Sequence, residues 1–142
     1  MRESSSDCRM EGHRRNRKCH GHYHQPYHRP ARDKLASTKF LAKIWGIPFN
    51  EEAVGIFAPL RINETLTLDC DEDAEPFDVH HYAFKLSDSE FDAMFSRIKA
   101  EGILYGSGPH ARENVAINHH AGGRGVYFCD LNGHILELLT AE

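Results

Sequence analysis

Histidine and cysteine are the residues of this chain best suited to binding a metal ion, and they are unevenly placed. The sequence of 142 residues holds 11 histidines and four cysteines. Five histidines fall within the first 30 residues: His13, His20, His22, His24 and His28. The cysteines are Cys8, Cys19, Cys70 and Cys129, and none belongs to a Cys-x-x-Cys pair. Cys8 and Cys19 lack the spacing of a compact zinc finger, and dispersed cysteines of this kind predict reduced thiols.

A second group of candidate residues lies on predicted strands. His81 follows His80 in VHHYAFKL (79–86), and Glu137 interrupts the apolar run ILELLT (135–140). Imidazole nitrogens and carboxylate oxygens are ligands for divalent cations. Taken alone, however, a glutamate in an apolar strand is more often a partnered edge residue. His80 is in the same way more often a surface histidine. The residue types therefore leave both interpretations open.

The helices are indicated by capping residues and by apolar periodicity. Asp33 is suited to cap a helix over 34–45, and Gly46 to end it. The apolar side of this helix is predicted to be Leu35, Phe40, Leu41 and Ile44. A second helix is predicted to open at Asp88 and Glu90 and to run to about Lys99. Its apolar face is Phe91, Met94, Phe95 and Ile98.

The strands are predicted from alternation and from turn residues. They cover 53–62, 65–70, 79–86, 125–129 and 135–140. Asn132-Gly133 marks the turn between the last two strands. Residues 71–75 are predicted to be a solvated acidic loop and 104–123 a loop-rich region. With one more strand before Asp33, the chain would consist of two β-α-β-β-β units.

The composition predicts one domain but also a division within the chain. Hydrophobic residues make up 40% and charged residues 27% of the sequence, which excludes wholesale disorder and a collagen-like protein. No apolar run reaches the roughly 20 residues of a membrane helix. The charged N-terminus argues against a secretory signal, and we expect a cytoplasmic protein.

Residues 1–30 differ from the rest of the chain. They hold seven Lys/Arg against three acids, a formal +4, and no Leu, Ile, Val or Phe. Residues 31–142 hold ten basic residues against eighteen acidic ones, a formal −8. We therefore expect a disordered tail over 1–30 and one globular domain over 31–142.

Two segments of that domain resemble the vicinal oxygen chelate superfamily, which includes glyoxalases and the fosfomycin- and bleomycin-resistance proteins. They are HHYAFKLSDSEFDAMFSRIKAEGI (80–103) and GGRGVYFCDLNGHILELLT (122–140), and DKLASTKFLAKIWGIPF (33–49) looks like the family's first helix. The resemblance implies an α+β fold of paired β-α-β-β-β modules. These modules form a half-open mixed β-barrel around one divalent metal ion.

The resemblance also implies roles for particular residues. His81 matches the metal-binding histidine of the second module, and Glu137 matches the metal-binding carboxylate. Tyr127 matches a pocket-lining aromatic position of fosfomycin-type relatives. His119 and His120 lie in a loop where relatives often contact substrate. The metal would be Zn, Ni, Mn or Fe. His134, in contrast, is interpreted as a turn residue that hydrogen-bonds locally.

The sequence predicts that the first strand expected from the family is missing or scrambled. Relatives have a strand of the type Asn-His-Thr-Ile-Val-Pro where this chain reads QPYHRP (25–30), so the first ligand position falls on Pro26. Read one base later, the codons for these residues permit Asn-His-Thr-Ile-Val. We therefore hypothesise that residues 1 to about 29 are translated from the wrong frame. The alternative hypothesis is that the tail is correctly translated and is a metal-binding or nucleic-acid-binding arm.

Two functions from different classes follow from the resemblance. The first is a divalent-metal-dependent enzyme acting on a small oxygenated substrate, of the isomerase or lyase, epoxide-opening transferase or extradiol dioxygenase type. The second is a metal-free binding protein that sequesters ligands, as bleomycin-resistance proteins do. Either way, we expect a small-molecule partner and a homodimer, and we expect neither nucleic acid nor a membrane as a partner.

Overall fold

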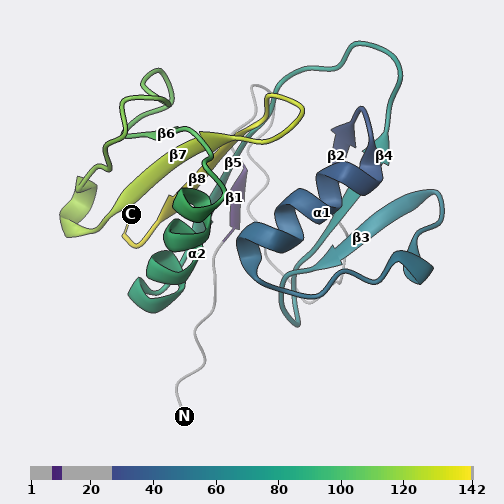
Figure 1. The fold of residues 1–142 in the computed structure, drawn as a ribbon, viewed down its shortest axis with the longest axis horizontal. Coiled ribbons are helices and arrows are strands. Elements are labelled where there is room, and N and C mark those ends of the chain that lie inside the picture. The colour runs from purple at the N-terminus through teal and green to yellow at the C-terminus, as the bar shows by residue number, and fades with distance from the viewer. Residues whose placement is uncertain (1–7, 11–26, 142) are drawn as a thin grey trace. The chain divides into compact units, whose positions relative to one another are not determined.

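The computed structural model describes residues 8–10 and 27–141, which form two compact modules. The first module covers residues 27–78 of the described chain. The second covers residues 79–141, together with the short strand β1 (Cys8–Met10). Each module is a helix with its own β-sheet (Figure 1). The predicted α+β class and the paired modules with open, mixed sheets are confirmed.

The first module is built on a three-stranded sheet with the order β2-β4-β3. Strand β2 (Tyr27–Ala31) pairs in parallel with β4 (Thr67–Glu72), and β3 (Phe57–Arg61) pairs antiparallel with β4. Helix α1 (Lys34–Trp45) packs against β3 and β4, and a 3₁₀ turn, η1 (Glu51–Ala53), connects α1 to the sheet. Pro59 lies in β3, an edge strand, where a missing backbone N–H is tolerated.

Both ends of α1 are where the capping residues predict them. The Asp33 carboxylate accepts a hydrogen bond from the Ala36 amide, and Gly46 ends the helix at φ 67°, a left-handed conformation that favours glycine. The apolar face is only partly as predicted. Leu41 and Ile44 are fully buried, but Leu35 is 37% exposed because Thr38 and Ser37 occupy the positions facing the sheet.

A strand occupies the place of the missing first strand. Residues Tyr27–Ala31 pair along β4 from Leu68 to Glu72, although the segment contains Pro30 and has a poor strand composition. Backbone pairing with a strong neighbour therefore overrides local propensity here. The predicted tail boundary at residue 30 falls inside this strand. The predicted disorder of residues 1–30 stays a prediction, since most of that stretch lies outside the described residues.

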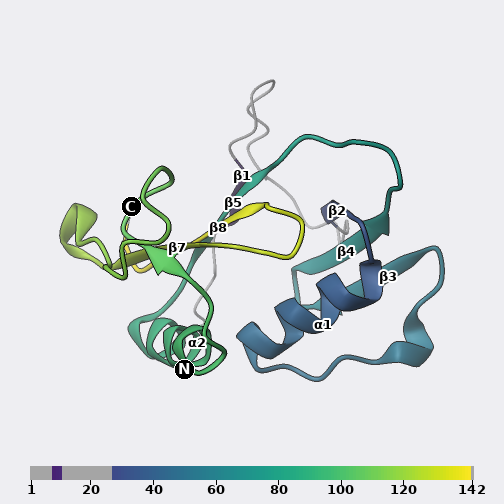
Figure 2. The ribbon, with the colours of Figure 1, turned by 45° about the horizontal axis from the view of Figure 1, so that its top comes forward.

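The second module is a five-stranded sheet with the order β1-β5-β8-β7-β6. Its main strands are β5 (His81–Lys85), β7 (Gly125–Cys129) and β8 (Ile135–Leu139), and they lie side by side in both views (Figures 1 and 2). Strand β5 is parallel to β8, whereas β7 is antiparallel to it. Helix α2 (Asp88–Ala100) follows β5, and the two-residue strand β6 (Tyr105–Gly106) pairs with β7.

One face of this sheet forms the core of the second module. Tyr82, Phe84, Val126, Phe128, Leu136 and Leu138 are all buried, and they are paired in register across β5, β8 and β7. The buried residues of α2 are Phe91, Met94 and Ile98. Alternation along the strands sends His81, Tyr127 and Glu137 to the opposite, open face. The same periodicity that builds the core thus collects the candidate residues on one side.

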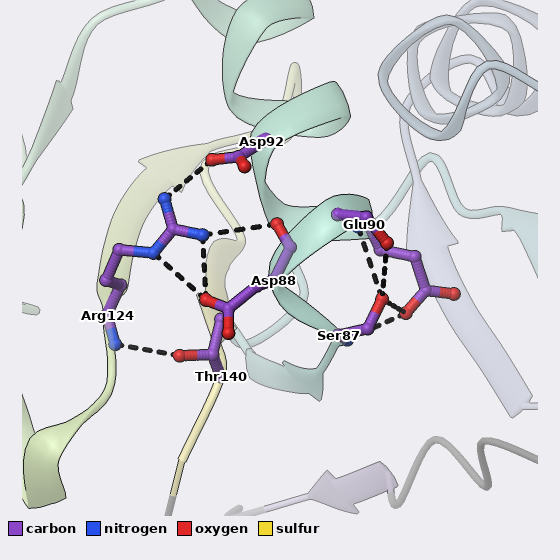
Figure 3. Close-up of polar contacts among 7 residues, drawn as sticks. Ser87, Asp88, Glu90, Asp92, Arg124 and Thr140 are labelled. Carbon is purple, nitrogen blue, oxygen red and sulfur yellow. Dashed lines mark hydrogen bonds and ion pairs between the residues drawn. The ribbon is translucent and has the colours of Figure 1, made fainter.

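Arg124, the residue that precedes β7, contacts the start of α2 (Figure 3). Its guanidinium donates to the Asp92 carboxylate at 2.6 Å and to the Asp88 carboxylate at 2.8 Å, and it lies over the Phe91 ring at 4.5 Å. Ser87 and Glu90 form a reciprocal capping box at the same helix end. The helix is therefore capped at Ser87 and begins at Asp88, where the sequence indicated.

Two local predictions are wrong. The strand predicted over 53–62 begins only at Phe57 and ends at Arg61, and its first residue, Ala53, belongs to the 3₁₀ turn η1. Strand β4 continues through Asp71 and Glu72, the first residues of the predicted acidic loop, because both pair with β2 and Asp71 also with β3. Among the described residues, no helix is long and apolar enough to cross a bilayer.

Candidate functional site

Three predicted site residues come together on the open face of the second module. His81 Nε2 lies 3.0 Å from Glu137 Oε2, and the Tyr127 hydroxyl donates a 2.6 Å hydrogen bond to Glu137 Oε1. The His81 and Tyr127 rings are 5.7 Å apart. Each carboxylate oxygen thus has its own partner, and Glu137 is the centre of the cluster.

Strand register explains why these side chains meet. Glu137 lies directly opposite Tyr127 in the antiparallel pair of β8 and β7, the position of closest side-chain approach. In the parallel pair of β5 and β8, Ala83 is the direct neighbour of Glu137, and His81 lies two residues away on the same face. The small Ala83 side chain leaves the imidazole room to reach across to the carboxylate.

The electrostatics of the cluster favour an ionised Glu137. Burial raises the pKa of the Glu137 carboxyl. Hydrogen bonds from His81 and Tyr127, together with the charges of His81 and His120, lower it by more, so the pKa lies below its ordinary value. The side chains of His81 and Glu137 are 27% and 17% exposed. The cluster is therefore centred on a half-buried anion.

The donor set fits part of a divalent metal site. An imidazole and a carboxylate are ligands typical of Zn, Mn, Fe and Ni. The 3.0 Å between His81 Nε2 and Glu137 Oε2 matches two neighbouring ligands bound about 2.1 Å from one ion at about a right angle. Tyr127 binds the other carboxylate oxygen and so leaves Oε2 directed toward His81. These two residues can supply two adjacent ligand positions.

A third ligand is not found in the part of the chain that the structure describes. Over residues 8–10 and 27–141, no three His, Cys, Asp or Glu side chains gather in a way that could hold a metal ion. The ligand position predicted at Pro26, and the neighbouring His24, lie outside the described residues. His28 is described and lies on β2 of the first module, where its ring contacts Phe57 at 4.8 Å.

The other histidines considered in the sequence analysis lie in different environments. His119 and His120 are exposed at the 3₁₀ turn η2 (His120–Gly122) before β7, and the charge of His120 contributes to the low pKa of Glu137. His80 is exposed and its Nδ1 lies 2.8 Å from the Tyr82 hydroxyl.

The prediction that His134 hydrogen-bonds locally in its turn is incomplete. Its amide does hydrogen-bond to Asp130 in the turn, as expected. Its ring, however, is fully buried and accepts a hydrogen bond from the His80 amide, 54 residues away. Sequence reasoning missed this contact because only the parallel pairing of β5 with β8 creates it.

Comparison with known proteins supports this architecture. No protein-family model and no curated protein matches the chain. Among solved structures, the chain is 41% identical to "Oxidase ChaP-H2", over 83% of this chain and 94% of that one, with a TM-score of 0.74. It is 37% identical to "Oxidase ChaP-H1", over 83% and 96%, with a TM-score of 0.73.

More distant structures share the fold. The fosfomycin resistance protein FosX from Mesorhizobium loti is 19% identical, over 83% of this chain and 91% of that one, with a TM-score of 0.60. The glyoxalase/bleomycin resistance protein from Catenulispora acidiphila is 17% identical, over 83% and 97%, with a TM-score of 0.62. With the two oxidases, these matches show that the chain belongs to the vicinal oxygen chelate superfamily.

Proposed function

We propose that this chain is a divalent-metal-dependent oxidase that acts on a small oxygenated substrate. The observation that carries the proposal is the convergence of His81 Nε2 and Glu137 Oε2 at 3.0 Å on the open sheet face. The oxidase type is favoured over the isomerase, lyase or epoxide-opening type because two solved structures above 30% identity are named oxidases.

The residues of the cluster have distinct tasks in this proposal. His81 and Glu137 hold the ion, and Tyr127 keeps the Glu137 carboxylate oriented by donating to Oε1. When bound, the ion supplies Lewis acidity and, for Mn or Fe, redox chemistry toward substrate oxygens. The Tyr127 ring and the His81 ring line the face on which the substrate would lie.

Metal analysis of purified protein tests the proposal. We expect metal in stoichiometric amount in the wild-type protein and its loss in Glu137→Ala and His81→Ala. Glu113→Gln is the matched control, since Glu113 is an exposed loop residue without a role in the cluster. Oxygen uptake with catechol and hydroquinone probes then tests the oxidase type. A protein that keeps its metal after Glu137→Ala contradicts the proposed site.

A metal-free binding protein is the second candidate. The described residues supply two metal ligands rather than three, and a structural neighbour is named as a glyoxalase/bleomycin resistance protein. Under this proposal the open face binds aromatic or cationic ligands without chemistry. Ligand binding to wild-type protein that contains no metal and takes up no oxygen would support it.

We also propose a homodimer, as expected from the family resemblance. Light scattering of the purified chain tests this. A molar mass near twice the 16.2 kDa of one chain is the expected result, and a mass of one chain contradicts it.

A further inference from the structure

The buried ring of His134 accepts a hydrogen bond from the backbone amide of His80, the residue before the metal-ligand candidate His81. His134 is 0% exposed, and its Nδ1 accepts a 3.0 Å hydrogen bond from the His80 amide. The Ile135 amide donates to the His80 carbonyl at 2.9 Å. The His134 ring and the Ile135 amide therefore hydrogen-bond to the N–H and the C=O of His80, respectively. Because Nδ1 accepts, the ring is neutral and carries its proton on Nε2.

The turn before β8 fixes the position of the His134 ring. Asp130 Oδ1 accepts hydrogen bonds from the amides of Asn132 and His134, both at 2.9 Å, and the Asp130 amide donates to the His134 carbonyl. Gly133 takes a φ of 80°, which a side chain would disfavour. The ring thus extends from a rigid turn, so it can hold another strand in place.

Packing around the ring adds to this rigidity. The Tyr82 ring meets the His134 ring edge-on, with centroids 5.6 Å apart at 88°, and the His80 ring lies 5.4 Å away. The Tyr82 hydroxyl is 2.8 Å from His80 Nδ1. The start of β5 is therefore held on its buried side by His134 and Tyr82. His81, the next residue, faces the opposite side of the sheet.

We propose that His134 is a positioning residue for His81. By holding the His80 backbone, it fixes where β5 begins and so keeps His81 Nε2 within reach of Glu137 Oε2. The inference rests on the proposed function in one respect, namely that His81 and Glu137 bind a metal ion. Outer residues that orient metal ligands typically contribute 10- to 100-fold to metal affinity.

Two substitutions separate positioning from simple packing. His134→Leu fills the site but removes the acceptor, whereas His134→Asn places an amide oxygen where Nδ1 lies and restores it. Three quantities are measured for each: hydrogen exchange of the His80 amide, the nuclear Overhauser effect between the His81 and Tyr127 rings, and Mn²⁺ affinity by calorimetry. The first two are recorded on metal-free protein, so they do not depend on metal binding.

The expected result is rescue by asparagine. In His134→Leu the His80 amide exchanges rapidly, the His81–Tyr127 effect weakens, and Mn²⁺ affinity falls 10- to 100-fold. In His134→Asn all three stay near wild type. The proposal is overturned if His134→Leu keeps the ring contact and an affinity within about twofold of wild type, or if both variants lose them equally.

Two further outcomes are also decisive. If His134→Leu does not fold, His134→Gln replaces it, since its amide lies one bond further out and cannot imitate Nδ1. If the wild-type protein binds no Mn²⁺, the metal site of the proposed function fails. The amide exchange and ring contact on metal-free protein then decide the role of His134 by themselves.

Discussion

The Tyr127 hydroxyl donates a 2.6 Å hydrogen bond to Glu137 Oε1, the carboxylate oxygen that His81 does not contact. These two residues lie directly opposite each other on β7 and β8. Their contact holds the carboxylate plane and leaves Oε2 for His81. The pairing of β7 with β8 therefore sets the orientation of the Glu137 carboxylate in the proposed metal site.

Removing the Tyr127 hydroxyl tests whether it orients the Glu137 carboxylate. In Tyr127→Phe the ring remains, but Glu137 loses one of the two hydrogen bonds that lower its pKa. We expect the Glu137 pKa to rise and Mn²⁺ affinity to fall about 10-fold. Carbon-detected NMR titration and calorimetry measure the two effects. An unchanged Glu137 pKa would show that the hydroxyl does not orient the carboxylate in solution.

Acid stability of the metal-free protein should depend on Glu137. Its pKa in the folded state lies below the ordinary value of 4.5. The unfolded state therefore binds a proton more readily, and the contribution of Glu137 to stability is present above the unfolded pKa and lost as the pH falls through the folded pKa.

Urea unfolding of wild-type protein and Glu137→Gln, at several pH values from about 7 down to 3, measures this contribution. The difference in unfolding free energy between the two should be constant near neutral pH and shrink in acid. Glu113→Gln serves as the control with no such trend. A difference that grows as the pH falls is the contradictory result.

Arg124 should matter more to stability than an ordinary surface ion pair. It contacts Asp88, Asp92 and the Phe91 ring together, so it links α2 to the start of β7 (Figure 3). We expect Arg124→Ala to lower the melting temperature clearly, with part of the effect screened by salt.

Lys39→Ala is the matched comparison for Arg124→Ala. Lys39 forms a single ion pair with Glu51, and both side chains are more than half exposed. Such pairs contribute little, so we expect almost no change. Scanning calorimetry at low and high salt measures both variants. Equal effects of the two substitutions would mean that the contacts of Arg124 do not act together.

Arg29 connects the reading-frame hypothesis to a stability measurement. The Arg29 side chain is 1% exposed. It lies on the same face of β2 as the buried Ala31, and its partner in register on β4 is the buried Cys70. The shifted frame permits valine at this position. If valine is the natural residue here, as the shifted frame permits, we expect Arg29→Val not to lower the free energy of unfolding.

Chemical denaturation measures this change, and Arg61→Val, at an exposed position of β3, is the control. Destabilisation by Arg29→Val would argue that arginine is the proper residue there. The nucleotide sequence across codons 20–32 tests the hypothesis itself. If the shifted codons do not read Asn-His-Thr-Ile-Val, the frame hypothesis is wrong.

The sequence by itself determined those features that depend on neighbouring residues. Asp33 and Gly46 predicted the ends of α1 because capping is a local interaction. Alternation in β5 and β8 placed His81 and Glu137 on one face each, since side chains of a strand alternate. The family resemblance then identified both as candidate ligands, together with Tyr127.

Only the tertiary structure decided which residues meet. The contact of Glu137 with His81, 56 residues away, depends on parallel pairing of β5 with β8. The hydrogen bond from His80 to the His134 ring depends on the same pairing, and it replaced a purely local interpretation. Strand β2 formed along β4 despite Pro30, because backbone hydrogen bonds to a neighbouring strand outweigh local propensity. Register between distant strands is a property of the whole sheet, so no single segment encodes it.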